Sequence, residues 1–245
     1  MLELALPDPW IFLGMALLIA FSAFMQGVGG VGFAMFAAPV AAMVAPQMVP
    51  GTLLTLGGLV SLLTALRERR DILWTSAGTA LAGRAAGTLM AAFTLTWLAP
   101  RFIGLLFAAL ILLAVGLSLA GLRIVATRRT VTIAGIVSGL MGTLTSVGAP
   151  PLAIAFQHSP PPNLRATLGI TLFCGSAMSL TMLAMTGHYT LPQFMMGLAL
   201  LPFLVAGFAL SGRVRQHLSH TLIRRFVLAF CTCSAIGLIV KAVTH

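Results

Sequence analysis

Charged residues divide the chain into long apolar stretches. No charged side chain interrupts three of them, which lie between Asp8 and Arg67, between Arg129 and Arg165, and between Arg165 and Arg213. A helix that spans a bilayer needs about 20 mostly apolar residues, so each stretch is long enough for more than one crossing. The alternation that marks transmembrane β-strands is absent from these stretches. The pattern predicts an all-α polytopic membrane protein.

Glycine, proline and charge mark the ends of the predicted elements. In the first half, the predicted helices cover Pro9 to about Gln26, 31–45, Thr52–Leu66, Ile72–Leu98 and Pro100–Leu122. In the second half, they cover Thr130–Met141, 149–158, Leu164–Thr186, Gln193–Leu210 and about Thr221 to Val243. Each half therefore has a helix, a break, a short helix, a proline turn and three long helices. Whether the short helices cross fully or are re-entrant stays open.

The two halves also match at individual positions. At an offset of about 116, Ser22 falls on Ser138 and Gly32 falls on Gly148, and such internal similarity is the signature of a structural repeat. We therefore divide the chain into a first transmembrane repeat, a basic cytoplasmic linker and a second transmembrane repeat, over residues 9–122, 123–129 and 130–243.

Basic residues are concentrated in a few loops, and this distribution orients the chain. Cytoplasmic loops carry an excess of Lys and Arg, so we expect 67–71, 123–129 and 212–220 on that side. Counting crossings backward from the last of these loops places 187–192 outside and 159–163 inside. Each half then contains a returning helix pair and three crossings, an odd number. The halves must lie in opposite orientations, which is the inverted-topology repeat plan of many secondary transporters.

Composition supports this interpretation. The chain has 245 residues, of which 59% are hydrophobic and 7% charged, and its net charge is +10. Most of the arginines lie at the ends of apolar stretches, where orientation in a membrane accounts for them, so we expect a lipid bilayer and no nucleic acid as partner. The cysteines at 174, 231 and 233 lack metal-binding spacing and lie in apolar stretches, so we expect no metal and no cofactor.

The two breaks carry the candidate binding chemistry. Non-helical backbone at membrane depth is tolerated only where it is buried in protein or lines a watery cavity, and paired breaks in inverted repeats indicate a transport site. Each short helix would direct its N-terminal end, which favours anions, at the protein centre. The candidate binding residues here are Gln26, Gly27, Gly29, Gly30, Gly32, Thr143, Thr145, Ser146 and Gly148. The alternative is that these small residues only allow tight helix packing.

Arg84 lies near the middle of the predicted helix 72–98 and is a further candidate. An arginine at the bilayer centre costs at least about 2.5–3.5 kcal/mol, so we expect it to face the interior and pair with a carbonyl or balance an anionic substrate. The alternative is that its side chain reaches a membrane interface. Arg165 begins a helix and is expected at the cytoplasmic edge. No intramembrane carboxylate is expected, because the acids are Glu3, Asp8, Glu68 and Asp71.

The residues around the breaks resemble the TauE/SafE (TSUP) family of sulfite and organosulfonate exporters. The resemblance rests on GVGGVGFAMFAAP followed by GT at 51–52, and on SGLMGTLTSVGAPPL followed by AT at 166–167. It implies a multispanning inner-membrane protein that moves small, often sulfur-containing anions, and it adds Thr52 and Thr167 to the candidate binding residues. Val31 and the glycine-poor TLTSVG depart from the family pattern, which leaves the substrate open.

These observations lead to a functional hypothesis with two rivals. We expect a secondary transporter, and an exporter, of a small anion such as sulfite or an organosulfonate, bound between the breaks in a bacterial-type inner membrane. One rival is a membrane subunit or assembly factor without transport. The other is an intramembrane serine protease with Ser138 as nucleophile and His188 as base, although His188 is expected in an outer turn. The oligomeric state stays open, with a homodimer among the alternatives.

Overall fold

All regular structure that the computed structural model describes is helical. It describes residues 8–97, 109–110, 112–113, 116–117 and 124–214. The α-helices with defined bounds are α1 (Pro9–Gly29), α2 (Phe33–Val44), α3 (Gly51–Arg67), α4 (Trp74–Trp97), α6 (Arg128–Thr145), α7 (Ala149–Ala155), α8 (Pro161–Met185) and α9 (Leu191–Val214). Short 3-10 turns cover Pro46–Met48 and Arg69–Asp71. The predicted helix 221–243 and most of the predicted helix 100–122 lie outside the described residues.

The breaks are shorter than the sequence predicts. α1 continues past Gln26 to Gly29, and α6 continues past Met141 to Thr145. The prediction that glycine and threonine end the two helices at Gln26 and Met141 is wrong. Packing against neighbouring helices outweighs the weak helix propensities of these residues. Each helix is followed instead by a capping residue in the left-handed region, which is Gly30 after α1 and Ser146 after α6. Its N–H closes the last helical turn, onto the carbonyl four residues earlier.

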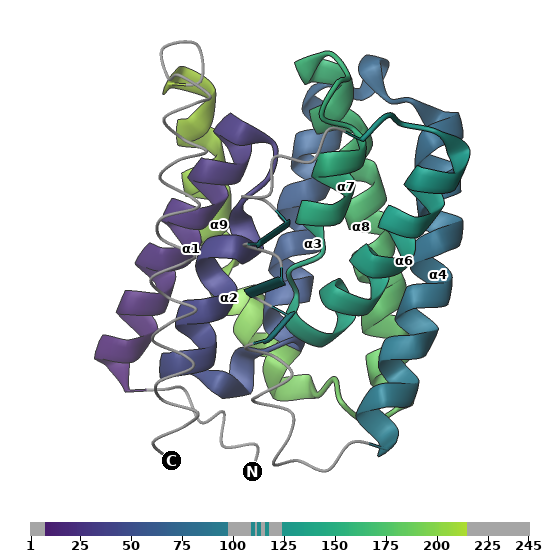
Figure 1. Ribbon diagram of the computed structural model, residues 1–245. Helices are drawn as coiled ribbons and strands as arrows, with labels where there is room; N and C mark the ends of the chain where they lie inside the picture. The colour runs from purple at the N-terminus through teal and green to yellow at the C-terminus, as the bar shows by residue number, and fades with distance from the viewer. Residues whose placement is uncertain (1–7, 98–108, 111, 114–115, 118–123, 215–245) are drawn as a thin grey trace.

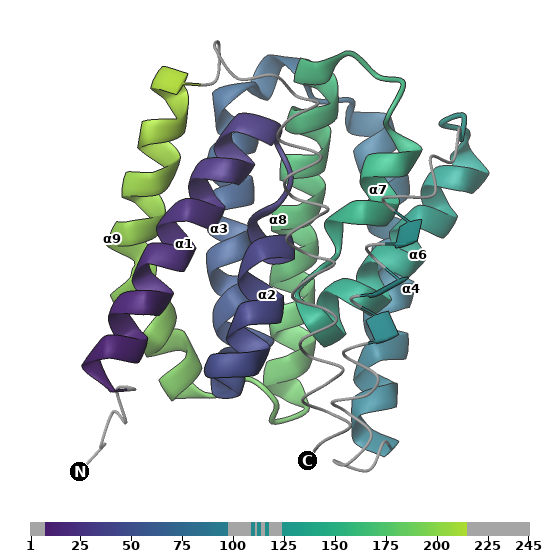
Figure 2. The same cartoon turned by 60° about the vertical axis from the view of Figure 1, so that its left-hand side comes forward.

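The helices form two flanking pairs around a central pair. α1 packs against α9, α4 packs against α6, and α3 and α8 lie between them, with the short helices α2 and α7 against these two (Figures 1 and 2). Glycines bring the backbones of α4 and α6 into contact. A Cβ atom on Gly87 would lie 2.0 Å from the carbonyl oxygen of Ile136, and one on Gly139 would lie 2.4 Å from that of Arg84. Small residues at such contacts are typical of helix pairs in membranes.

The central helices α3 and α8 run antiparallel. At one end, Asn163 Nδ2 donates to the carbonyl oxygen of Asp71 at 2.9 Å. At the other end, the hydroxyls of Thr55 and Tyr189 lie 2.8 Å apart. Segments 67–71 and 159–163 therefore share one end of the molecule, and the 187–192 turn lies at the opposite end.

The directions of the other long helices follow from the direction of this central pair. α1 and α9 end where α3 ends, because Arg67 donates to the carbonyl oxygens of Gly27 at 3.4 Å and Phe208 at 3.2 Å. α4 starts at that same end, and α6 runs parallel to it, since Gly83 contacts Thr132 four residues before Gly87 contacts Ile136. Each described long helix of the first half thus runs opposite to its counterpart in the second half, as Figure 1 shows.

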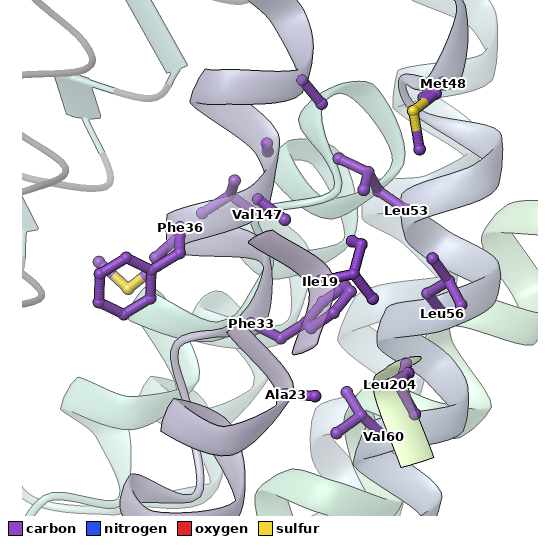
Figure 3. Packing of buried hydrophobic residues seen from close by; sticks show 14 of the residues in the cluster. Ile19, Ala23, Phe33, Phe36, Met48, Leu53, Leu56, Val60, Val147 and Leu204 are labelled. Atoms are coloured by element: carbon purple, nitrogen blue, oxygen red, sulfur yellow. The ribbon is translucent and has the colours of Figure 1, made fainter. Parts of the chain in front are cut away.

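An apolar core joins the first half to the second break. Figure 3 shows Ile19 and Ala23 of α1, Phe33 and Phe36 of α2, and Leu53, Leu56 and Val60 of α3 in one cluster with Val147 and Leu204. By length and hydropathy, three of the described helices can each cross a membrane, and they are Pro9–Gly29, Pro161–Met185 and Leu191–Arg213. The protein is a multi-pass membrane protein, and the inverted orientation of its halves in the bilayer stays a prediction.

Candidate functional site

A small cavity lies where the two breaks meet, between the central helices. We call it the central cavity, and its volume of about 30 Å³ has room for one or two water molecules. The first turn of α2 lines it on one side and the second break on the other. In Figure 1 the short helices extend from this level toward opposite ends of the molecule. The lining residues are Gln26, Gly32, Phe33, Ala34, Met35, Leu53, Leu54, Gly57, Ser61, Ser146, Val147, Gly148, Ala149, Leu172 and Ser176.

Gln26 holds the first break in shape. Its Oε1 accepts a hydrogen bond from the backbone N–H of Phe33 at 3.1 Å, and its Nε2 donates to Ser61 Oγ at 2.9 Å. The first N–H of α2, which would otherwise lack a partner, is thereby capped by a side chain from the end of α1. Gly32, which precedes α2, has a φ of 133°, a conformation that only glycine adopts readily.

Ser146 is the turning point of the second break. Its φ of 65° makes it the one non-glycine residue with positive φ in the described part of the chain. Its Oγ donates to the carbonyl oxygen of Pro50 at 3.0 Å, which ties the second break to the start of α3. Two residues later, Gly148 caps α7 and leaves no side chain between the cavity and the residues behind it.

Arg84 lies next to Gly148, behind the cavity lining. Its side chain is 1% exposed, which confirms that it faces the protein interior. Its Nη1 donates to Ser138 Oγ at 2.9 Å, and Ser138 Oγ in turn donates to the carbonyl oxygen of Gly148. The arginine is therefore paired with a hydroxyl and reaches the expected carbonyl only through it. No carboxylate among the described residues forms an ion pair with Arg84, and its Nε has no hydrogen-bond partner.

Three glycines make room for the guanidinium group. A Cβ atom on Gly175 would lie 1.9 Å from Arg84 Nε, one on Gly148 would lie 3.1 Å from Nη1, and one on Gly142 would lie 3.2 Å from Nη2. These glycines come from α8, the second break and α6. The position of a buried, uncompensated cation beside the cavity is thus set by three separate segments.

Several predicted site residues lie away from the cavity lining. Thr143 bonds to Thr88 and Ser179, and Thr145 bonds to the carbonyl oxygen of Met141 in its own helix. Both threonines belong to α6 because that helix is longer than expected. Gly29 is the last residue of α1 and is half-buried. These three residues therefore do not line the cavity of the described structure.

The remaining predicted residues join helices to one another. Gly27 packs against the side chain of Ser211, and Gly30 packs against Arg165. Thr52 donates to the carbonyl oxygen of Gln193 at 2.9 Å, and Thr167 accepts from the backbone N–H of Leu73 at 3.0 Å. Of the predicted set, Gln26, Gly32, Ser146 and Gly148 line the cavity, and Arg84 lies behind it.

Two serines of the lining were not predicted. Ser61 of α3 and Ser176 of α8 are buried at 3% and 7% exposure, and both line the cavity. Ser61 and Ser176 are separated by the same offset as Thr52 and Thr167. A comparison of the two repeats at this offset could therefore have predicted both serines. Arg165 lies in the first turns of α8, as predicted, but the sequence did not show that it is 5% exposed and bonded to Glu68.

The two residues of the protease alternative are not paired. Ser138 is fully buried and bonded to Arg84 and Gly148, as described above. His188 is exposed in the turn before α9, where its Nδ1 lies 3.2 Å from Thr186 Oγ1. A nucleophile and its base must lie within hydrogen-bond reach, so this arrangement does not support hydrolysis.

A multi-pass helical membrane protein with two central breaks and a buried cation has the plan of a transporter for anions. The chain belongs to the sulfite exporter TauE/SafE family, whose model matches residues 15–238. This is a family of membrane transporters and not of enzymes, which confirms the resemblance that the break residues indicate. Comparisons with curated proteins and with solved structures return no match.

Proposed function

We propose that the protein is a secondary transporter that exports a small oxyanion such as sulfite or an organosulfonate, bound at the central cavity in a conformation in which this cavity is wider than the one described above. The observation that carries this proposal is Arg84, a buried cation with no carboxylate partner among the described residues, which lies beside Gly148 of the cavity lining. An ionisable side chain inside a membrane protein is expensive to bury and is a functional-site candidate by default. A bound anion would compensate its charge.

Further groups around the cavity favour an anion. The first turn of α2 lines it, and the N-terminal end of a helix carries about half a positive charge. The side chains of Gln26, Ser61, Ser146 and Ser176 contribute polar groups to the wall. None of the lining residues is acidic, so no fixed negative charge opposes an anion there.

The direction of transport follows from the charge of the substrate. A membrane potential that is negative inside favours the exit of an anion by about 2.3 kcal/mol per charge per 100 mV. Export from the cytoplasm therefore needs no coupling ion. In this proposal the protein lies in a bacterial-type inner membrane, and its two halves, as inverted repeats, alternate access to the cavity from the two sides.

The substitution Arg84→Gln tests the site. We expect sulfite flux from proteoliposomes to fall by at least about tenfold, because one lost charge-assisted hydrogen bond is worth about 1.5–3 kcal/mol. Arg84→Lys should keep part of the flux, since the charge remains. Arg69→Gln, which alters an exposed arginine in the 67–71 loop, is the matched control and should transport normally. Equal flux in Arg84→Gln and Arg69→Gln contradicts the site assignment.

The same preparation separates transport from the rival of a non-transporting membrane subunit. Reconstitution of the purified chain, with no other protein present, should give sulfite flux above that of empty liposomes. Flux that appears only when membrane extract is added would support the subunit interpretation instead.

A further inference from the structure

A buried ion pair closes one end of the contact between α3 and α8. Arg165 Nη2 lies 2.7 Å from Glu68 Oε1, and Arg165 Nε lies 2.9 Å from Glu68 Oε2. The two side chains are only 6% and 11% exposed. Arg165 belongs to the first turns of α8, and Glu68 caps the end of α3, so this bidentate pair joins the second half of the chain to the first.

The same arginine packs against the first break. Gly30, which caps the C-terminal end of α1, has a φ of 80°, and a Cβ atom on it would lie 2.2 Å from Arg165 Cγ. The end of α1, the end of α3 and the start of α8 therefore meet at one side chain. Because 67–71 is basic, this end of the molecule is the one expected in the cytoplasm.

Little protein separates the ion pair from the central cavity. One turn along α8 from Arg165, Gly169 contacts α3 so closely that a Cβ atom on it would lie 2.8 Å from the N of Ala65 and 2.8 Å from the O of Ser61. The next α8 residues that face α3, Leu172 and Ser176, already line the cavity, as does Ser61. The pair and one tight helix contact thus form the barrier between the cavity and the cytoplasmic end.

The opposite end is held together differently. There Ser146 Oγ donates to Pro50 O at 3.0 Å, and Thr52 Oγ1 donates to Gln193 O at 2.9 Å. Segments 45–55 and 186–193 contain no Asp, Glu, Lys or Arg. In the part of the chain that the structure describes, the end expected in the cytoplasm is therefore the one closed by opposite charges.

We propose that Arg165 is an anion-recruiting gate at the cytoplasmic mouth of the central cavity. Glu68 holds its guanidinium group when no anion is present, and a small oxyanion arriving from the cytoplasm takes the place of Glu68. A guanidinium fork binds two oxygens of one centre in a bidentate manner, whether they belong to a carboxylate or to an oxyanion. The exchange keeps the more deeply buried arginine paired throughout, and the displaced charge is that of Glu68, the more exposed of the two side chains. This inference rests on the proposed transport of an anion and adds the site at which the anion is first bound.

The test combines Glu68→Gln with Arg165→Gln and measures gate opening separately from transport. Ser176→Cys, in a background with the cysteines at 174, 231 and 233 replaced by serine, reports access to the cavity. An uncharged, membrane-impermeant thiol reagent is applied to the cytoplasmic face of inverted vesicles. We expect both variants to be modified about tenfold faster than the protein with the intact pair, the effect of losing one charge-assisted hydrogen bond.

The two variants should differ in transport. With the native serine at 176, the half-saturating sulfite concentration at the cytoplasmic face should rise about tenfold in Arg165→Gln, because the recruiting charge is lost. In Glu68→Gln it should stay equal or fall, because the arginine is free to bind the anion. A purely structural pair would shift both variants in the same direction.

A charge exchange provides the control for folding. The double variant Glu68→Arg with Arg165→Glu should restore slow modification of the reporter without restoring the wild-type half-saturating concentration, since the arginine has moved to α3. Unchanged modification in both single variants, or equal shifts of half-saturation in both, overturns the gate. If the wild-type protein moves no sulfite, the proposed function fails, whereas the modification rates still decide whether the pair closes the cavity.

Discussion

At the scale of single residues, glycine decides where the buried charge can lie. Arg84 needs space for a planar guanidinium group inside a packed helix bundle, and interiors are packed too densely to leave such space by chance. Gly142, Gly148 and Gly175 supply it by the absence of a side chain. Ser138 then fixes the orientation of the group through one hydrogen bond.

Substitution of Gly175 by alanine tests this arrangement. The new Cβ would lie 1.9 Å from Arg84 Nε, so the guanidinium group must move, and overpacking of this kind costs about 1–3 kcal/mol. We expect a lower unfolding temperature in detergent and sulfite flux reduced toward that of Arg84→Gln. Gly78→Ala on α4 is the control, because nothing lies within 4 Å of its Cβ position. Wild-type flux in Gly175→Ala would show that the position of Arg84 is unimportant.

At the scale of elements, small residues hold the helices together in two equivalent places. Gly83 and Gly87 of α4 contact the backbone of α6, and Gly207 of α9 contacts the backbone of α1 with a Cβ distance of 2.0 Å to Ala20 O. Lipid tails are as apolar as leucine, so helix association in a bilayer depends on close packing more than on the hydrophobic effect. The glycines therefore contribute to stability through contact.

Gly207→Leu should destabilise the α1–α9 pair without touching the cavity. Because the backbone of α1 blocks the new side chain, we expect a loss of about 1–3 kcal/mol, seen as a lower unfolding temperature and a smaller yield of monodisperse protein. Gly14→Leu, on the exposed side of α1 with nothing within 4 Å, serves as control. Similar stability of the two variants would contradict close packing as the source of association.

At the scale of the whole molecule, the ends of the helix bundle differ in charge. One end carries the basic segment 67–71 and the Arg165–Glu68 pair, and the other carries segments 45–55 and 186–193, which contain no Asp, Glu, Lys or Arg. Each described long helix of the first half runs opposite to its counterpart in the second half (Figure 2). Residues of both breaks line one cavity, and the alternating access that we propose would act on this cavity.

Thiol labelling in whole cells tests the orientation of the bundle. In the background without native cysteines, we expect His188→Cys to react with an impermeant reagent added outside, because His188 is exposed in the turn predicted to lie there. Arg69→Cys should react only after the cells are opened. Reaction of both from the outside, or of Arg69→Cys alone, would reverse or refute the predicted topology.

The site was predictable only in part. Gln26, Gly32, Ser146 and Gly148 were predicted because two breaks in matching positions imply a cavity, and they line the central cavity, while their role in binding stays a prediction. Thr143 and Thr145 were assigned to the break because helix propensities do not include tertiary packing. This packing extends α6 to Thr145.

The sequence by itself determined the class of the protein, the number of breaks and the basic end of the bundle. These properties follow from apolar stretches, charge placement and an internal repeat, which are local or periodic along one chain. Only the tertiary structure decided which side chains serve the cavity. The pairing of Arg84 with Ser138 and of Arg165 with Glu68 joins residues far apart in sequence, and such contacts depend on helix packing, which no local pattern records.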